Sequence, residues 1–154
     1  MGKAGNLLLE MMDILGDRLG ERINEFIFPP PIFNLMQGEI LELDLEAGFL
    51  TARFPILESY LNPYGVMQGG MITAAVDNTI GPLSVLVAPS NVTRNLEMKF
   101  SQPVKPELEY ILVKARLLEQ KKRRLFFEAE VCSPEGRRLA KCKAVHWIIE
   151  SNAD

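Results

Sequence analysis

Alternating apolar and polar positions run through most of the chain after residue 36 and predict β-strands. Residues 41–45 alternate leucine with acids, Ala47-Gly48 supplies a turn, and residues 50–54 alternate again before Pro55, which predicts a half-buried hairpin. The same period of two recurs later in the chain, over residues 92–101, 107–119, 125–132 and 137–149. The last of these stretches has small residues on one face, which lets a helix lie close to the sheet.

Residues 7–27 instead repeat their apolar side chains at helical spacing, with acids and arginines between them. This pattern predicts one accessory helix, ended by Pro29-Pro30-Pro31, and the three prolines form a stiff connector into the domain. The mixed charges favour a lid on the core or on a neighbouring subunit over a membrane-surface helix. We therefore predict an N-terminal helical extension with a proline-rich connector over residues 1–35 and one domain over residues 36–150.

Residues 62–81 organise the rest of the chain. A turn-rich loop beginning at Asn62-Pro63 leads to Gly69-Gly70, and Gly70 is the expected start of a helix. Pro82 either kinks this helix or ends it. The small or polar positions along the helix share one face, namely Gly70, Ala74, Asp77 and Gly81. The sequence thus predicts an α+β fold in which one long helix is wrapped by an antiparallel sheet.

The start of this helix is the first candidate for chemistry. The first backbone N–H groups of a helix have no partner within it, and the helix dipole attracts negative charge there. Gly69 and Gly70 leave these donors uncovered, so a polarised carbonyl oxygen fits there as in an oxyanion hole, and Gln68 adds a side-chain amide. Asp77 is the only acid within residues 62–81, and it is suited to act as a general base for water or as a nucleophile on an acyl group.

Helix geometry separates these groups. Gly69 and Asp77 are eight residues apart, which corresponds to about 12 Å along a helix, so they cannot both reach one carbonyl carbon from the same chain. If both act on one substrate, Asp77 meets Gly69 of a second copy, as two antiparallel helices across a two-fold axis would arrange. This geometry predicts an obligate homodimer with two equivalent shared sites.

The spacing Asn-x-x-Gly-x-x-Gln-Gly-Gly-x6-Asp-Asn, followed by a threonine-bearing strand and a Phe-Ser-x-Pro-Val segment, resembles the hot-dog thioesterase superfamily. Within it the match is closest to the phenylacetate-pathway type of acyl-CoA thioesterase, over roughly residues 36–150. The resemblance implies a hot-dog fold, with Asp77 as the catalytic carboxylate and the Gly69 amide as the oxyanion donor. It also matches Asn62 to a motif asparagine, and Thr93 to a residue that helps to orient the attacking water.

Gln68 is the departure from that pattern, because most members of this branch have histidine there. Some relatives, including one type of 4-hydroxybenzoyl-CoA thioesterase, resemble this chain in using glutamine, which donates a hydrogen bond but does not titrate. The implied function is hydrolysis of an acyl-CoA or, less readily, an acyl-carrier-protein thioester. No metal or redox cofactor is needed, since coenzyme A is part of the substrate. The alternative is a non-catalytic acyl-CoA binding or sensing protein that lost turnover with the histidine. The resemblance also implies a dimer of dimers.

Further substrate-binding residues are predicted on two segments. An apolar pocket near the entry loop, which would admit aromatic or medium-length acyl groups, is suggested by Phe49, Phe54, Tyr60, Tyr64 and Met67. Tyr64, Met67 and Gly70, the last at the helix start, are the predicted substrate-binding residues of this segment. Arg123 and Arg124 lie in a predicted hairpin turn, for which a solvated turn is the favoured interpretation. Binding of the phosphates of coenzyme A by these two arginines is the other interpretation.

Composition narrows the class of protein. A chain of 154 residues with 47% apolar content fits one ordinary domain, and a net charge of −3 gives no support for nucleic-acid binding. The apolar runs are interrupted well short of a membrane span and no signal-peptide pattern is present, so a cytoplasmic protein that does not bind membranes is expected.

Cys132 and Cys142 flank a turn, with expected cross-strand partners near 138 and 128, which favours free thiols. No metal-ligand spacing occurs. His146 is in phase with apolar neighbours and is expected to be a buried structural imidazole, outside the site.

Overall fold

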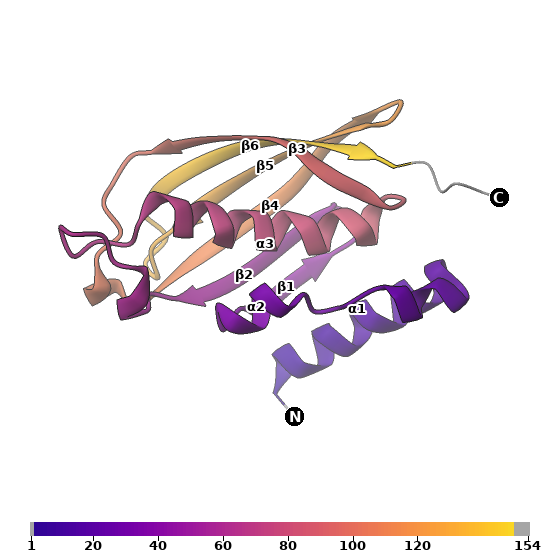
Figure 1. The fold of residues 1–154 in the computed structure, drawn as a ribbon, viewed down its shortest axis with the longest axis horizontal. Helices are drawn as coiled ribbons and strands as arrows, with labels where there is room; N and C mark the ends of the chain where they lie inside the picture. The colour runs from indigo at the N-terminus through magenta and orange to yellow at the C-terminus, as the bar shows by residue number, and fades with distance from the viewer. Residues whose placement is uncertain (1, 150–154) are drawn as a thin grey trace.

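The computed structural model describes residues 2–149 and has the predicted α+β architecture. Six antiparallel strands form one sheet in the order β1-β2-β4-β5-β6-β3, and the sheet curves around the long helix α3, with β1 and β2 below it and β3 and β6 above it in Figure 1. The strands are β1 (Glu39–Asp44), β2 (Phe49–Pro55), β3 (Asn91–Phe100), β4 (Tyr110–Lys121), β5 (Arg124–Cys132) and β6 (Arg138–Ile148). The α-helices are α1 (Lys3–Leu19), α2 (Pro31–Leu35) and α3 (Gly69–Val87). This is the arrangement that the hot-dog resemblance implied.

The period-two stretches all form strands, because alternation places every second side chain on the face that covers α3. Three hairpins join β1–β2, β4–β5 and β5–β6, whereas β3 returns to the far edge and pairs with β6. Both cysteines are free: Cys132 lies opposite Arg138 as expected, but Cys142 lies opposite Ala129. The expected partner near 128 was one residue off, because the register of the hairpin shifts at Val131/Cys132.

Helix α3 lies in the core. Its apolar face is covered by the sheet, and the buried Thr79 hydroxyl on that face donates to the Ala75 carbonyl oxygen (2.8 Å). The opposite, small-residue face is only partly covered by the described residues. Helix α3 has 19 residues, of which a stretch of 18 has a mean hydropathy of 1.3, so it is long and apolar enough to cross a membrane by length and composition alone. The expectation that every apolar run stops short of a membrane span was therefore wrong, and packing in the core explains the composition.

The two alternatives for Pro82 are resolved by the length of α3. The helix begins at Gly69, one residue before the expected Gly70, and continues through Pro82 to Val87. A proline inside a helix removes one N–H donor. The last turn is closed instead by the Ala88 amide, which donates to the Ser84 carbonyl oxygen (3.1 Å). Pro82 therefore does not end the helix. The turn beyond Pro82 is linked to the start of β3 by a hydrogen bond, in which Asn91 Nδ2 donates to Ser84 O (3.2 Å).

The N-terminal extension differs from the single helix predicted over residues 7–27. Helix α1 ends at Leu19, because Gly20 takes a positive φ of 54°, and a 3₁₀ helix follows over Gly20–Glu25. The prolines do not end that helix; the last of them starts the short helix α2. Helix α1 buries Met11 and Leu15 in the same core as the sheet, and Arg18 donates to the carbonyl oxygens of Val85 (3.1 Å) and Leu86 at the end of α3. The extension is thus packed against the domain and not a separate unit.

Candidate active site

A tightly bonded loop positions the start of α3. Asn62 Oδ1 accepts the backbone amides of Tyr64 (2.9 Å) and Val66 (3.3 Å), and the Asn62 amide donates to Val66 O (2.8 Å). At the end of the loop, the Gln68 amide donates to Tyr60 O (2.8 Å). Asn62 is therefore the residue that shapes this loop, with its Oδ1 occupied by backbone donors.

Gln68 is the N-cap of α3, and its carbonyl oxygen accepts the amides of Met71 (2.9 Å) and Ile72 (3.1 Å). Among the described residues, no acceptor contacts the amides of Gly69 or Gly70. A Cβ at Gly69 would lie 3.3 Å from the Phe100 ring, whereas at Gly70 only the Gln68 side chain would come near, at 3.9 Å. The first turn of α3 therefore presents two free N–H donors with a side-chain amide beside them, as an oxyanion site requires.

The carboxylate of Asp77 lies at one end of a row of hydrogen-bonded side chains. Thr93 Oγ1 on β3 lies 3.0 Å from Asp77 Oδ1 and 3.2 Å from His146 Nε2 on β6. The other ring nitrogen of His146, Nδ1, lies 2.8 Å from Asn91 Oδ1. Thr93 and His146 are opposite each other in the β3–β6 pairing, so the sheet register itself holds this row together.

The direction of these hydrogen bonds follows from Asn91. Its Nδ2 donates to two backbone carbonyl oxygens, at 2.8 and 3.2 Å, so Oδ1 faces His146 and requires a proton on Nδ1. In the neutral ring Nε2 is then an acceptor, and the single Thr93 hydroxyl proton goes either to Nε2 or to Asp77. In the charged ring Nε2–H donates to Thr93, which in turn donates to Asp77. Protonation of His146 is therefore coupled to the hydrogen bond that Asp77 accepts.

Burial governs the titration of the groups around Asp77. It lowers the pKa of His146 below its ordinary 6.5, an effect partly offset by the negative charge of Asp77. Burial, again with a contribution from Asp77, raises the pKa of the Cys142 thiol to about 11. Because only the thiolate is a strong nucleophile, the Cys142 thiol is expected to stay unreactive near neutral pH.

We expect the buried His146 to make stability depend on pH. The unfolded chain, in which the pKa is ordinary, takes up a proton at higher pH than the folded chain, so stability falls as the pH drops through 6.5 and stops falling below the lowered folded pKa. His146→Gln should lack this component. Urea unfolding of both proteins at pH 7.5 and at pH 5 checks it: the wild type should lose more stability than the variant, and parallel losses would contradict the argument.

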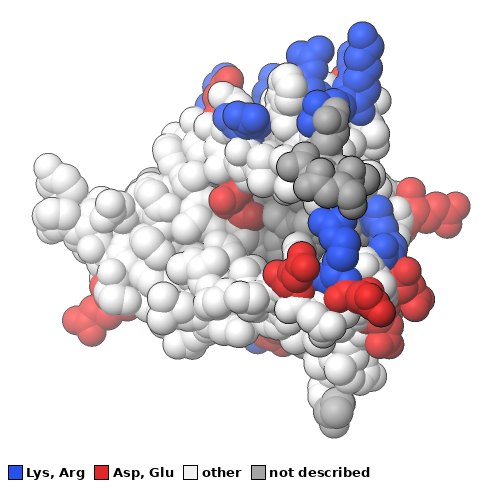
Figure 2. All heavy atoms as spheres, turned by 45° about the vertical axis from the view of Figure 1, so that its right-hand side comes forward, with Lys and Arg blue, Asp and Glu red and all other residues white. Residues whose placement is uncertain are grey.

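A cavity of about 330 Å³ opens beside Asp77. Asp77, Thr93 and His146 line it together with other residues of α3 and with Phe26, Ile27, Phe28 and Pro30 of the N-terminal extension. Figure 2 brings forward the side of the molecule on the right of Figure 1, and it shows this face hollowed, with charged side chains of both signs around the hollow. The candidate carboxylate is thus accessible to a ligand of small-molecule size.

The structure brings only some of the predicted site residues together. Asp77 and Thr93 are bonded, whereas Gln68 and Gly69 lie at the other end of the same helix, about 12 Å away by the helical rise. Tyr64 is 90% exposed at the tip of its loop, and Met67 is buried in the core, so neither lines the cavity in a single chain. Their role in binding stays a prediction.

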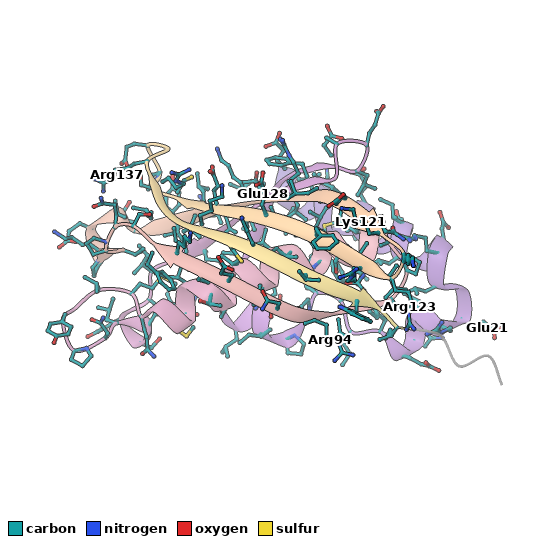
Figure 3. The ribbon with its side chains drawn as sticks, turned by 90° about the horizontal axis from the view of Figure 1, so that it is seen from above. Glu21, Arg94, Lys121, Arg123, Glu128 and Arg137 are labelled. Carbon is teal, nitrogen blue, oxygen red and sulfur yellow. The ribbon has the colours of Figure 1, made fainter. Side chains whose placement is uncertain are left out.

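Arg123 lies in the β4–β5 turn, as expected, and Arg124 is the first residue of β5, opposite Lys121. Arg123 donates from Nε and Nη2 to Ile148 O (3.1 and 2.9 Å), and the Arg124 guanidinium lies over the Phe126 ring (5.9 Å). Figure 3 shows Arg123 at the same end of the sheet as Arg94 and Lys121, with Arg137 at the other end. Arg123 thus joins the turn to the end of β6. Contact of this turn with the phosphates of coenzyme A remains a prediction.

His146 is the site residue that the sequence argument left out. Its burial was predicted correctly, and it is 1% exposed. The sequence argument did not predict that His146 contacts Thr93. Thr93 lies 53 residues away and reaches His146 only because β3 crosses to the edge of the sheet beyond β6. An isolated polar position within an otherwise apolar inner face was the available signal.

Comparison with known proteins agrees with the fold, in which an antiparallel sheet wraps a central helix as in hot-dog proteins. The model of the thioesterase superfamily matches residues 64–140, half of the chain, and the chain belongs to this superfamily. A search of curated proteins gives no match.

Three solved structures illustrate the relationship. A phenylacetic acid degradation-related protein from Ralstonia eutropha JMP134 shares 27% identity over 83% of this chain and 98% of its own, with a TM-score of 0.72. The E. coli PaaI protein from the phenylacetic acid degradation operon shares 14% identity over 94% and 97%, with a TM-score of 0.74. A Streptococcus pneumoniae TIGR4 thioesterase structure with coenzyme A shares 18% over 75% and 88%, with a TM-score of 0.67. The last two are similar in fold alone.

Proposed function

We propose that this protein hydrolyses an acyl-CoA thioester to a free acid and coenzyme A. The observation that carries the proposal is the Asp77 carboxylate, held by Thr93 at the end of an open cavity, on the same helix whose first amides at Gly69 and Gly70 have no acceptor among the described residues. Membership of the thioesterase superfamily supports the reaction type. The presence of coenzyme A in the S. pneumoniae thioesterase structure supports a CoA substrate.

Each group has a distinct part in the proposed reaction. The Gly69 amide, with the Gln68 side-chain amide, polarises the thioester carbonyl and binds the oxyanion. Asp77 either removes a proton from the attacking water or attacks the carbonyl carbon itself. In the first route the water oxygen bonds to the carbonyl carbon, the C–S bond breaks, and the departing thiolate takes the proton that Asp77 removed from the water. In the second route the Asp77 oxygen bonds to the carbonyl carbon, the C–S bond breaks, and water then hydrolyses the resulting anhydride to the free acid and restores the carboxylate, its remaining proton going to the thiolate. Asn62 and Thr93 position the water or the carboxylate, and His146 fixes Thr93.

We propose that each site is shared by two chains. Asp77 and Gly69 are about 12 Å apart within one helix, so one carbonyl requires Asp77 from one chain and Gly69 from its partner. Two features of the single chain support such a homodimer. Strand β3 is an edge strand with mostly exposed side chains, and the small-residue face of α3 beside it is only partly covered. A dimer of dimers in the cytoplasm completes the proposal.

The second candidate function is acyl-CoA binding without turnover. Gln68 favours it specifically, because an amide at the oxyanion position donates a hydrogen bond but cannot supply a proton to the leaving group. A binding protein would use the same cavity and the same free amides. The two functions differ only in whether thiol is released.

Thiol release from a panel of short, medium, long and aromatic acyl-CoAs tests the proposal. We expect release from at least one member, and the fastest member sets the substrate class. If none is cleaved while several raise the melting temperature, the binding function replaces the enzymatic one. An acyl-carrier-protein thioester in the same panel separates the two possible thiol carriers.

A further inference from the structure

The wall of the cavity opposite α3 comes from the N-terminal extension. Residues 26–30, which link the 3₁₀ helix to α2, contribute Phe26, Ile27, Phe28 and Pro30, and we call these four residues the connector wall. Across the cavity lie Gly81 and Val85 of α3, on the turns that follow Asp77. A ligand that reaches Asp77 from this side therefore runs between α3 and the connector wall.

The polar side chains of the cavity already have hydrogen-bond partners, in the backbone or in one another. Asn78 Nδ2 donates to Ala74 O (2.9 Å), Ser84 Oγ donates to Gly81 O (2.7 Å), and Asn91 uses both ends of its amide. Within residues 2–149, no lysine or arginine lines the cavity, and Asp77 is its only acidic lining residue. The pantetheine arm of coenzyme A carries amides that need partners, so this cavity suits the apolar end of a thioester.

Neighbouring residues of the connector wall are held differently. Phe28 packs against the core, and together with Phe33 and Pro82 it lines a second, much narrower space. Phe28 therefore anchors the connector. Ile27 lines the cavity but is 72% exposed. Ile27 is thus a large apolar side chain that stays exposed in the same cavity as the Asp77 carboxylate. Such a side chain is suited to contact an apolar ligand.

We propose that Ile27 and the connector wall bind the acyl group of the substrate and set the length of the apolar chain that is accepted. This inference rests on the proposed function, since the ligand is the acyl end of the thioester bound at Asp77. The N-terminal extension then selects the substrate and does not merely cover the core. Uncharged aliphatic or aromatic acyl groups are accepted, and acyl groups ending in a carboxylate are rejected by the bonded polar groups and by Asp77.

The test compares Ile27→Trp, Ile27→Ala and the control Leu35→Ala. Leu35 is also 72% exposed but lies on α2 and does not line the cavity. We measure kcat/KM for saturated acyl-CoAs of increasing length and for phenylacetyl-CoA. Ile27→Trp should lower kcat/KM for the longest accepted chain by about tenfold or more, because the larger side chain takes the space of the last methylenes and their apolar contacts are lost. The effect on acetyl-CoA should be much smaller. Ile27→Ala should move the optimum to longer chains, and the control should leave the profile unchanged.

Several outcomes would overturn the inference. One is an equal loss for all chain lengths in Ile27→Trp, another is a length profile that neither Ile27 variant alters, and a third is the same change in the control. If the wild type cleaves nothing, the proposed function fails separately, and binding of non-hydrolysable acyl-CoA thioethers of different lengths is measured instead. A length dependence of the dissociation constant that shifts with Ile27 supports the connector wall even then, and an unshifted one overturns it.

Discussion

Asp77→Asn is expected to lose most turnover while the protein folds and binds a CoA thioester as the wild type does. Asparagine keeps the size of the side chain, and its Oδ1 can still accept a hydrogen bond from the Thr93 hydroxyl, so the row of hydrogen bonds remains. It cannot take a proton from water at neutral pH or attack as a carboxylate. Removing a general base costs about 10²- to 10⁴-fold in rate, and this range is the expected loss in kcat.

The measurement pairs steady-state thiol release with calorimetric binding of a non-hydrolysable acyl-CoA analogue. Glu128→Gln is the matched control, because it also removes a carboxylate but lies on the outer side of the sheet, as Figure 3 shows, and outside the cavity. A kcat that is unchanged in Asp77→Asn would remove Asp77 from the chemistry. A loss of binding in place of kcat would assign it to substrate affinity.

The strands and α3 were predictable because each has a strong local pattern. Alternation over residues 110–121 or 138–148 leaves no other face for the apolar side chains, and the structure starts and ends these strands within three residues of the expected positions. The core helix was equally clear, since a face of small residues opposite a face of branched ones, at helical spacing, is typical of a helix packed on a sheet.

Local pattern failed where two signals compete. At the end of α1, Gly20 is a helix-ending residue, but Ile23 and Phe26 continue the helical spacing beyond it, and the spacing was given more weight. In the structure those apolar residues still pack against the core, from a 3₁₀ helix and a connector. Apolar spacing therefore predicted correctly that Ile23 and Phe26 are covered, but not the backbone that carries them.

The candidate site was only partly predictable, because its parts meet through long-range pairing. The motif places Gln68, Gly69 and Asp77 on one helix, and that placement is local. The contact of Thr93 with His146 depends on β3 pairing with β6, two strands that are not consecutive in the chain. Nothing in the sequence near His146 specifies that register, so a correctly predicted buried histidine was assigned a structural role alone.

Mixed dimers of Gly69→Pro and Asp77→Asn chains are expected to regain activity that neither variant has alone. Gly69 is the first residue of α3, and Gln68 before it has φ −63° and ψ 139°, a conformation compatible with a following proline. Proline there removes the amide donor and requires a small shift of the Phe100 ring, which a Cβ at residue 69 would approach to 3.3 Å. Loss of the donor should cost about 10²- to 10³-fold in kcat.

In a shared site, a heterodimer combines the intact Gly69 of the Asp77→Asn chain with the intact Asp77 of the Gly69→Pro chain. Its other site carries both changes. Equal random mixing makes half of the dimers heterodimers with one of two sites intact, so about a quarter of wild-type activity should return. The measurement is thiol release after co-refolding, with heterodimers separated by two affinity tags. Sites contained in one chain would each keep one defect, so confirmed heterodimers without activity would show that Asp77 and Gly69 do not act together across the two chains.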